Sequence, residues 1–125
     1  MSTPLNFLRV KGIALPVQDA DRANAFYRDT LALPRIDDDS GEVRYSLGGT
    51  ILMLKADFYA PPSDKPNPRI TVEVDHAPGV EAELRSRGVT VSDPVQLYGT
   101  SYVGSFLDSE GNKLWFCSYD EDAAS

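Results

Sequence analysis

The sequence predicts an α+β fold in which two βαβββ units, related by a pseudo-twofold axis, form a curved sheet around a cleft. Residues 12–19 return in pattern at residues 69–76, with apolar side chains at matching places. An amphipathic helical pattern follows each copy, and a proline-rich segment separates the two. A long repeat that occurs twice indicates one folding unit used twice, because a solenoid needs at least three copies.

The first unit, at about residues 9–56, carries the signals of one helix and four strands. Apolar residues alternate from 13 to 17, which is the period of a strand, and Asp19 can cap the helix that follows. Pro34 stops that helix, and Gly48 and Gly49 form a two-residue hairpin signal. We therefore expect a strand at 9–17, a helix ending at about 31, and strands beginning at 35 and spanning 43–47 and 50–55.

The second unit, at about residues 69–119, repeats this order after a linker at about 57–68. Residues 60–68 contain four prolines and exclude both a helix and a central strand. Gly88 is placed to end the second helix. We expect a strand at 69–74, a helix at 78–87, a strand at 89–92, and hairpin strands at 101–107 and 112–119. The 125 residues form a single predicted domain.

Composition limits the partners that the chain can have. Its 19 acidic and 12 basic residues leave a net charge of −7, which argues against nucleic acid because phosphate binding needs a basic face. No apolar run approaches the roughly 20 residues of a membrane span, and the N-terminal residues lack the apolar stretch of a signal peptide. Cys117 is the only cysteine, so no internal disulfide forms. We expect no membrane partner and a cytoplasmic location.

Three motifs in combination resemble a known family. The strand pattern at 13–17 leads into Ala-Phe-Tyr-Arg-Asp-Thr-Leu at 25–31, its counterpart at 70–75 follows the linker, and Asp-Ser-Glu-Gly-Asn stands at 108–112. Together they resemble the vicinal oxygen chelate superfamily, which includes glyoxalase I, extradiol dioxygenases, fosfomycin-resistance enzymes and bleomycin-resistance proteins. The resemblance covers about residues 9–119, and it implies the fold without fixing the function.

The resemblance also implies where a metal would bind, and this sequence lacks suitable ligands there. Active members hold a divalent metal through His, Gln or Glu at four strand positions, which here are Gly12, Met53, Arg69 and Trp115. Glycine has no side chain, arginine stays protonated, a thioether suits soft metals only, and indole is not a ligand. The only histidine, His76, falls in the turn after the strand, where an exposed or capping role is expected. We predict no metal site and no cofactor.

Strand alternation sorts the residues that should line the cleft. Ile13, Leu15 and Val17, like their counterparts in the second unit, should pack under the helices, so that the residues between them face the cleft. Aromatic residues in loops and hairpins, including Tyr45 and Tyr98, should surround its mouth. The predicted ligand-binding residues are Arg69, Thr71, Glu73, Met53, Trp115, Ser101, Ser105, Phe58 and Tyr102.

Arg69, Glu73 and Trp115 are the sharpest candidates, and each has a plainer interpretation. Arg69 and Glu73 lie four residues apart on one strand face, about 13 Å along the chain, so they should not pair with each other. Arg69 can anchor an anionic or carbonyl group and Glu73 can bind an amine or act as a base, or both can be solvated at the rim. Trp115 can stack on a planar ligand, or it can simply fill the space left by a metal.

Three hypotheses about function follow. The first is a metal-independent binding protein that sequesters an aromatic or amphipathic molecule, similar to bleomycin-resistance proteins. The second is a metal-free lyase or isomerase in which Glu73 is the general base and Arg69 stabilises an oxyanion. The third is an interaction or scaffold domain whose cleft is filled by its own side chains. The resemblance further implies a homodimer.

Overall fold

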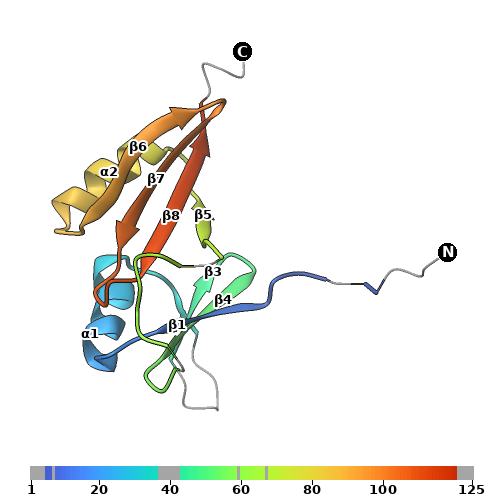
Figure 1. Cartoon of the computed structure of the whole chain (residues 1–125), viewed down its shortest axis with the longest axis vertical. Coiled ribbons are helices and arrows are strands. Elements are labelled where there is room, and N and C mark those ends of the chain that lie inside the picture. The colour runs from blue at the N-terminus through green and yellow to red at the C-terminus, as the bar shows by residue number, and fades with distance from the viewer. Residues whose placement is uncertain (1–4, 7, 37–42, 59, 67, 121–125) are drawn as a thin grey trace.

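The chain contains two four-stranded sheets. The computed structural model describes residues 5–6, 8–36, 43–58, 60–66 and 68–120. The strand orders are β1-β4-β3-β2 and β5-β8-β7-β6, so the two sheets have the same topology (Figure 1). In each sheet the first strand pairs parallel with the last, and the other pairs are antiparallel. The prediction of two βαβββ units in an α+β fold is therefore confirmed.

The first unit follows the predicted order of elements. Asp19 caps the helix, because its side chain accepts a hydrogen bond from the Arg22 N–H at 3.0 Å. Gly48 takes a φ of 61° in the predicted hairpin turn. The connection between the strand predicted to begin at 35 and the strand predicted at 43–47, residues 37–42, lies outside the described residues. The elements are β1 (Gly12–Pro16), α1 (Ala20–Ala25), η1 (Phe26–Thr30), β2 (Arg35–Ile36), β3 (Arg44–Leu47) and β4 (Thr50–Lys55).

The second half of the predicted first helix is a π-helix, η1, which the sequence pattern did not reveal. The Leu31 N–H donates to the Phe26 carbonyl at 2.9 Å, five residues back instead of four. Ala32 then takes a φ of 56°, a left-handed conformation that is uncommon for a residue with a side chain. The helix therefore ends in two consecutive irregularities before Pro34.

The second unit also has the predicted order, with one strand longer than expected. Gly88 follows α2 with a φ of 77°, as a glycine that ends a helix does. The strand predicted at 89–92 runs on to Tyr98, so that expectation was wrong. Pro94 is tolerated there because the strand lies at the sheet edge and its register shifts on both sides of Asp93. The elements are β5 (Thr71–Glu73), α2 (Ala77–Ser86), β6 (Val91–Tyr98), β7 (Ser101–Leu107) and β8 (Lys113–Tyr119).

One hydrophobic cluster takes side chains from both units. Tyr27, Leu52, Leu114 and Phe116 are fully buried in it. Tyr45, which was expected at the mouth of the cleft, is also fully buried, and its hydroxyl donates to the Asn24 side chain at 2.9 Å. That expectation was wrong because the alternation of β3 points Tyr45 toward the helix. None of the helices within the described residues is long and apolar enough to cross a membrane.

The turn between β7 and β8 locks the two units together through buried polar groups. The Tyr27 hydroxyl, from the first unit, donates to Asp108 Oδ2 at 2.7 Å. Asp108 also accepts the backbone N–H groups of Glu110 and Asn112, at 2.9 and 2.8 Å. The Asn112 amide donates to the Pro16 carbonyl of β1 at 2.9 Å. Each buried polar group of the turn thus finds a partner, several of them across the unit boundary.

Glu110 completes this lock with an ion pair. Its carboxylate accepts the backbone N–H groups of Gln18 and Asp19 at 2.9 and 2.8 Å, and Arg22 Nε lies 2.6 Å away. The Glu110 side chain is 0% exposed, whereas Arg22 is half exposed. Arg22 and the two N–H groups lower the pKa of Glu110 from its usual 4.5 to about 2, against the opposing effect of burial. Ionised Glu110 is therefore the form that the folded chain stabilises.

Replacing Glu110 with Gln should destabilise the fold and flatten its dependence on acid. A carboxylate whose pKa is lower in the folded chain stabilises it fully above pH 4.5 and loses that effect as the pH falls toward about 2. We expect Glu110→Gln to cost about 2 kcal/mol at pH 7, with a shallower loss of stability from pH 5 to pH 2. Urea denaturation at several pH values measures both. Asp29→Asn, at an exposed ion pair with Arg28, is the matched control and should change little.

Candidate functional site

The side of the second sheet opposite α2 carries most of the predicted site residues, and we call it the open face. Backbone pairing aligns Thr71, Trp115, Ser105 and Asp93 in one row across β5, β8, β7 and β6. Because side chains alternate along a strand, Leu114, Phe116 and Ser118 point the other way and are buried. The prediction that Leu114 and Phe116 point to the packed side of β8 is therefore confirmed.

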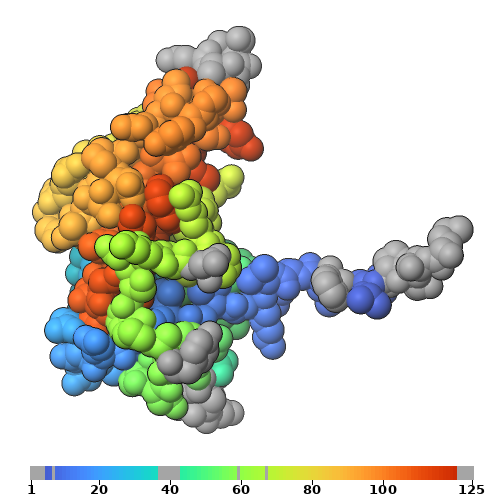
Figure 2. All heavy atoms as spheres, in the orientation of Figure 1, coloured from blue at the N-terminus to red at the C-terminus, as the bar shows by residue number. Residues whose placement is uncertain are grey.

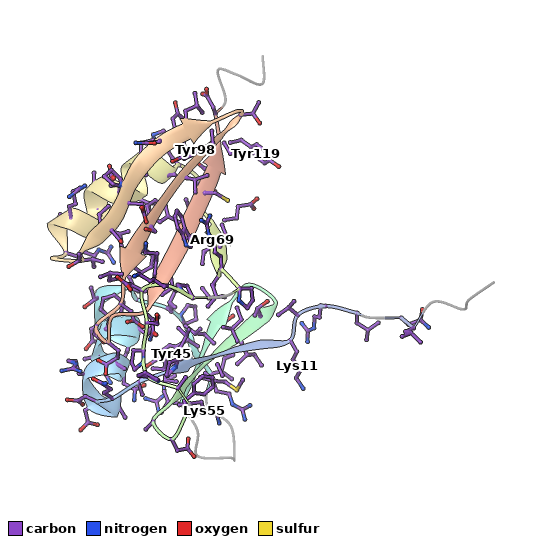
Figure 3. All side chains as sticks on the ribbon, viewed as in Figure 1. Lys11, Tyr45, Lys55, Arg69, Tyr98 and Tyr119 are labelled. Carbon is purple, nitrogen blue, oxygen red and sulfur yellow. The ribbon has the colours of Figure 1, made fainter. Side chains whose placement is uncertain are left out.

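Arg69 lies beside β5 and β8 of the second sheet (Figure 3). Its guanidinium is placed over the ring of Trp115. Its guanidinium carbon is 4.2 Å from the centroid of the Trp115 ring, and Lys113 Nζ is 5.3 Å from the same ring. Two cations near one indole are stabilised by the negative potential of the ring face. The structure thus brings Arg69 and Trp115 together, and one face of the indole is already covered by a cation.

A carboxylate next to this stack belongs to a residue that the sequence analysis missed. Asp93 Oδ2 lies 2.9 Å from Lys113 Nζ and accepts a hydrogen bond of 2.5 Å from the hydroxyl of Ser105. The Ser105 hydrogen bond, then Lys113 and Arg69, lower the pKa of Asp93. Asp93 therefore balances the charge of Lys113. Within the described residues Arg69 has no hydrogen-bonded carboxylate of its own.

The four positions where the family places metal ligands fall into two touching pairs. In the first unit, a side chain built at Gly12 would meet Met53 Cε at 3.1 Å, so the thioether of Met53 fills that space. In the second unit, the Arg69 guanidinium lies over the Trp115 ring, so these two side chains occupy the corresponding space. A guanidinium at this point repels a divalent cation, and the described residues contain no group of three or more His, Cys, Asp or Glu side chains placed to hold one. The residues present do not fit a metal.

Thr71 and Glu73 line a groove of about 550 Å³ between β5 and the turn that joins β3 to β4. Glu73 is exposed, and among the described residues no hydrogen bond or ion pair holds its carboxylate. Glu73 therefore lacks the burial that a strong general base would require.

The remaining predicted residues are divided between different surfaces. Ser101 stands on β7 opposite Tyr119, at the far end of the open face. Tyr102 points to the other side of the sheet and packs against the core, so it does not join the predicted group. Phe58 lines a separate groove in the loop after β4, together with Pro16. His76 is exposed at the N-terminus of α2, as predicted.

Two residues of the open face escaped the sequence analysis for identifiable reasons. Tyr119 continues the alternation of Lys113 and Trp115 along β8 and is 69% exposed, so the strand period alone could have found it. Asp93 was missed because the strand that carries it was predicted to end one residue earlier. Tyr98, expected in a loop, lies in β6 and is 60% exposed.

Comparison with known proteins identifies the family. The model of the Glyoxalase/Bleomycin resistance protein/Dioxygenase superfamily matches residues 9–116. The chain belongs to this superfamily. The resemblance noted from the motifs is thus confirmed, and no curated protein sequence gives a significant match.

Solved structures of the superfamily share the fold at low sequence identity. An antibiotic binding protein from Streptomyces sp. CB03234, TnmS3, is 22% identical with a TM-score of 0.77, over 90% of this chain and 97% of that one. A putative glyoxalase family protein from Bacillus anthracis is 16% identical with a TM-score of 0.78, over 95% and 99%. A lactoylglutathione lyase from Agrobacterium tumefaciens is 19% identical with a TM-score of 0.67, over 88% and 92%. Binding proteins and enzymes thus share this architecture.

The purified protein should contain no stoichiometric divalent metal, unlike the metal-dependent members of the superfamily. Gly12 and Trp115 offer no ligand atom, and Arg69 places a positive charge over the Trp115 ring, where it would repel a cation. Elemental analysis for zinc, nickel, iron and manganese, with melting curves in the presence and absence of EDTA, tests this. A full equivalent of any of these metals, removed by EDTA with a fall in melting temperature, would contradict it.

Proposed function

We propose that the chain is a metal-independent small-molecule binding protein whose ligand is a planar aromatic compound with an acidic group. The observation that carries the proposal is the Arg69 guanidinium stacked 4.2 Å from the Trp115 ring centroid without a carboxylate partner among the described residues. An arginine whose guanidinium lies over an indole ring can still offer N–H donors to a ligand. Such an arginine is prepared for an anion that comes with an aromatic body.

The surroundings of the stack favour the same ligand chemistry. Lys113 is occupied by Asp93, so a ligand anion would be directed to Arg69 instead. An aromatic body can lie over the outer face of the guanidinium or replace it on Trp115, and Thr71 is next in the row. Tyr119 offers a second exposed aromatic ring on the same strand face.

The two alternative functions receive less support. A metal-free lyase or isomerase needs Glu73 as a buried base, but Glu73 is exposed. A scaffold domain needs a cleft filled by its own side chains, whereas the groove beside Thr71 and Glu73 is open, at about 550 Å³. TnmS3, which shares this fold, is an antibiotic binding protein, and this similarity supports sequestration of a natural product as the biological role. A cytoplasmic location, expected from the sequence, is part of this proposal.

A pair of probes that differ only in charge tests the ligand class. We expect 2-naphthoate to quench the fluorescence of Trp115, the only tryptophan, and 2-naphthamide to bind at least about 10-fold more weakly, because the amide loses the charged hydrogen bond to Arg69. Arg69→Ala should weaken 2-naphthoate by about 10- to 100-fold and leave 2-naphthamide nearly unchanged. Isothermal titration gives both affinities.

Arg28→Ala is the matched control, because Arg28 is an exposed arginine of η1 that pairs with Asp29. It should bind both probes as the wild type does. Trp115→Ala, followed by calorimetry, should weaken both probes because the stacking surface is gone. Equal affinities for the two probes, or binding unaffected by Arg69→Ala and Trp115→Ala, would place the ligand elsewhere and defeat the proposal.

We further propose that the protein is a homodimer in which the N-terminal arm, the described residues before β1, packs on a second copy. Arg9 Nη1 donates a hydrogen bond to the Gly49 carbonyl at 2.9 Å, beside the start of β4. On the N-terminal side of Arg9 the arm extends away from the body of the chain (Figure 2). Leu5, Leu8 and Val10 are 80%, 91% and 66% exposed, which is costly for aliphatic side chains in water. Among the described elements no helix packs on the open face, and a second copy would cover it.

Light scattering should give a mass twice the 13.7 kDa of one chain. The double variant Leu5→Asp/Leu8→Asp should weaken the dimer at least about 100-fold, because each copy loses two apolar contacts. Ala82→Asp/Thr90→Asp adds the same charge at exposed positions on and after α2, and it should remain dimeric. A wild-type monomer at micromolar concentration, or a dimer insensitive to the arm substitutions, would contradict this model.

A further inference from the structure

A second cavity lies on the other side of the second sheet, away from the open face. It has a volume of about 220 Å³ and sits between α2, η1 and the inner surfaces of both sheets. Its walls are mostly aliphatic and aromatic, with Leu31 and Leu52 from the first unit and Val74, Leu84 and Phe116 from the second. Because β8 alternates, Phe116 faces this cavity while Trp115 faces the open face.

Each of the three polar side chains that line the cavity, those of Tyr27, Glu83 and Arg87, has a hydrogen-bond or ion-pair partner. The Tyr27 hydroxyl donates a hydrogen bond to Asp108 Oδ2 at 2.7 Å. Glu83 and Arg87 form an ion pair at 2.9 Å, and Arg87 Nη1 also donates to the Thr30 carbonyl at 2.8 Å. A bound water needs two to four polar partners, and the inner walls supply none, because Glu83 and Arg87 are the partly exposed members of the lining. The cavity is therefore suited to an apolar molecule.

The wall formed by the first unit is irregular where it meets the cavity. Tyr27 belongs to η1, whose π-helical turn is wider than an α-helical one, and Leu31 follows directly. Next to Leu31, Ala32 adopts a left-handed backbone with a φ of 56°. Strained backbone of this kind persists where the surroundings enforce it, and it is common at ligand clamps. Two independent irregularities thus coincide with the cavity.

A contact between the two units, which we call the strap, lies beside the cavity, which is partly open to solvent. Arg87 reaches from the end of α2 to the Thr30 carbonyl at the end of η1, and it is braced by Glu83 on α2. The side chains of Arg87 and Glu83 are 42% and 60% exposed, so their ion pair is a weak, water-screened contact. Opening this strap would admit a small molecule without unfolding the core.

We propose that this cavity is a second binding site, for a compact neutral molecule built on one benzene ring, with access controlled by Arg87. An apolar cavity of about 150 Å³ is known to bind benzene and to exclude water, so 220 Å³ accommodates one ring with a short alkyl group. A charged ligand of the same size is disfavoured, because the inner walls are apolar and the two charged side chains of the lining, Glu83 and Arg87, already neutralise each other. The site is independent of the aromatic anion site proposed for Arg69 and Trp115.

Ethylbenzene and benzylammonium, which are similar in size and differ in charge, test the proposal by methyl NMR on the intact chain. We expect ethylbenzene to produce saturable shifts in the methyl groups of Val74, Val80 and Leu84, and benzylammonium to produce none. Val80→Phe fills the cavity from α2 and should weaken ethylbenzene at least 10-fold. Leu31→Phe fills it from the opposite wall and serves if Val80→Phe does not fold. Arg87→Ala should accelerate exchange of ethylbenzene, because the strap is lost.

Competition separates the two proposed sites. Saturating ethylbenzene should leave the quenching of Trp115 by 2-naphthoate unchanged, and displacement of 2-naphthoate would overturn the claim of a separate site. The absence of saturable methyl shifts in the wild type would show that the cavity stays empty, and it would overturn the proposal directly. Undiminished binding in the folded filling variants would do the same.

Discussion

The burial of two carboxylates on one short turn is the constraint on which the arrangement of the molecule depends. Asp108 and Glu110 both lie inside the protein, and each is satisfied by donors from the first unit, the Tyr27 hydroxyl in one case and Arg22 with two backbone N–H groups in the other. An unpaired buried carboxylate is strongly unfavourable, so these contacts favour the observed arrangement of the two units over arrangements that would break them. This docking turns the helix sides of both sheets toward a shared core.

The same docking gives the two sides of the second sheet different chemistry. Along β8, Trp115 is left on a side with cations and a carboxylate, while Leu114 and Phe116 close against the first unit. A single strand therefore separates a polar, aromatic surface from an apolar cavity. The proposed anion site and the proposed apolar site differ in ligand class because they lie on these two different sides of the sheet.

Much of the fold could be predicted because it follows local periodicity and turn chemistry. The repeat, the hairpin glycines and the prolines of the linker identified both units. Local signals failed where tertiary contacts overrode them. The strand β6 extends past Pro94 because an edge position tolerates a missing N–H. The segment η1 is a π-helix although its sequence pattern is that of an α-helix. Tyr45 and Tyr102 were assigned to the cleft as aromatic residues of hairpins, but strand alternation points them toward the core.

The sequence by itself determined the family, the two units, the sorting of side chains on β8 and the unsuitability of Gly12, Met53, Arg69 and Trp115 as metal ligands. Those properties depend on residue type and on spacing along the chain. Only the tertiary structure decided that Arg69 lies on Trp115, that Asp93 balances Lys113, and that a cavity remains beneath α2. Such contacts join residues far apart in sequence, and they depend on how the buried turn positions one unit against the other.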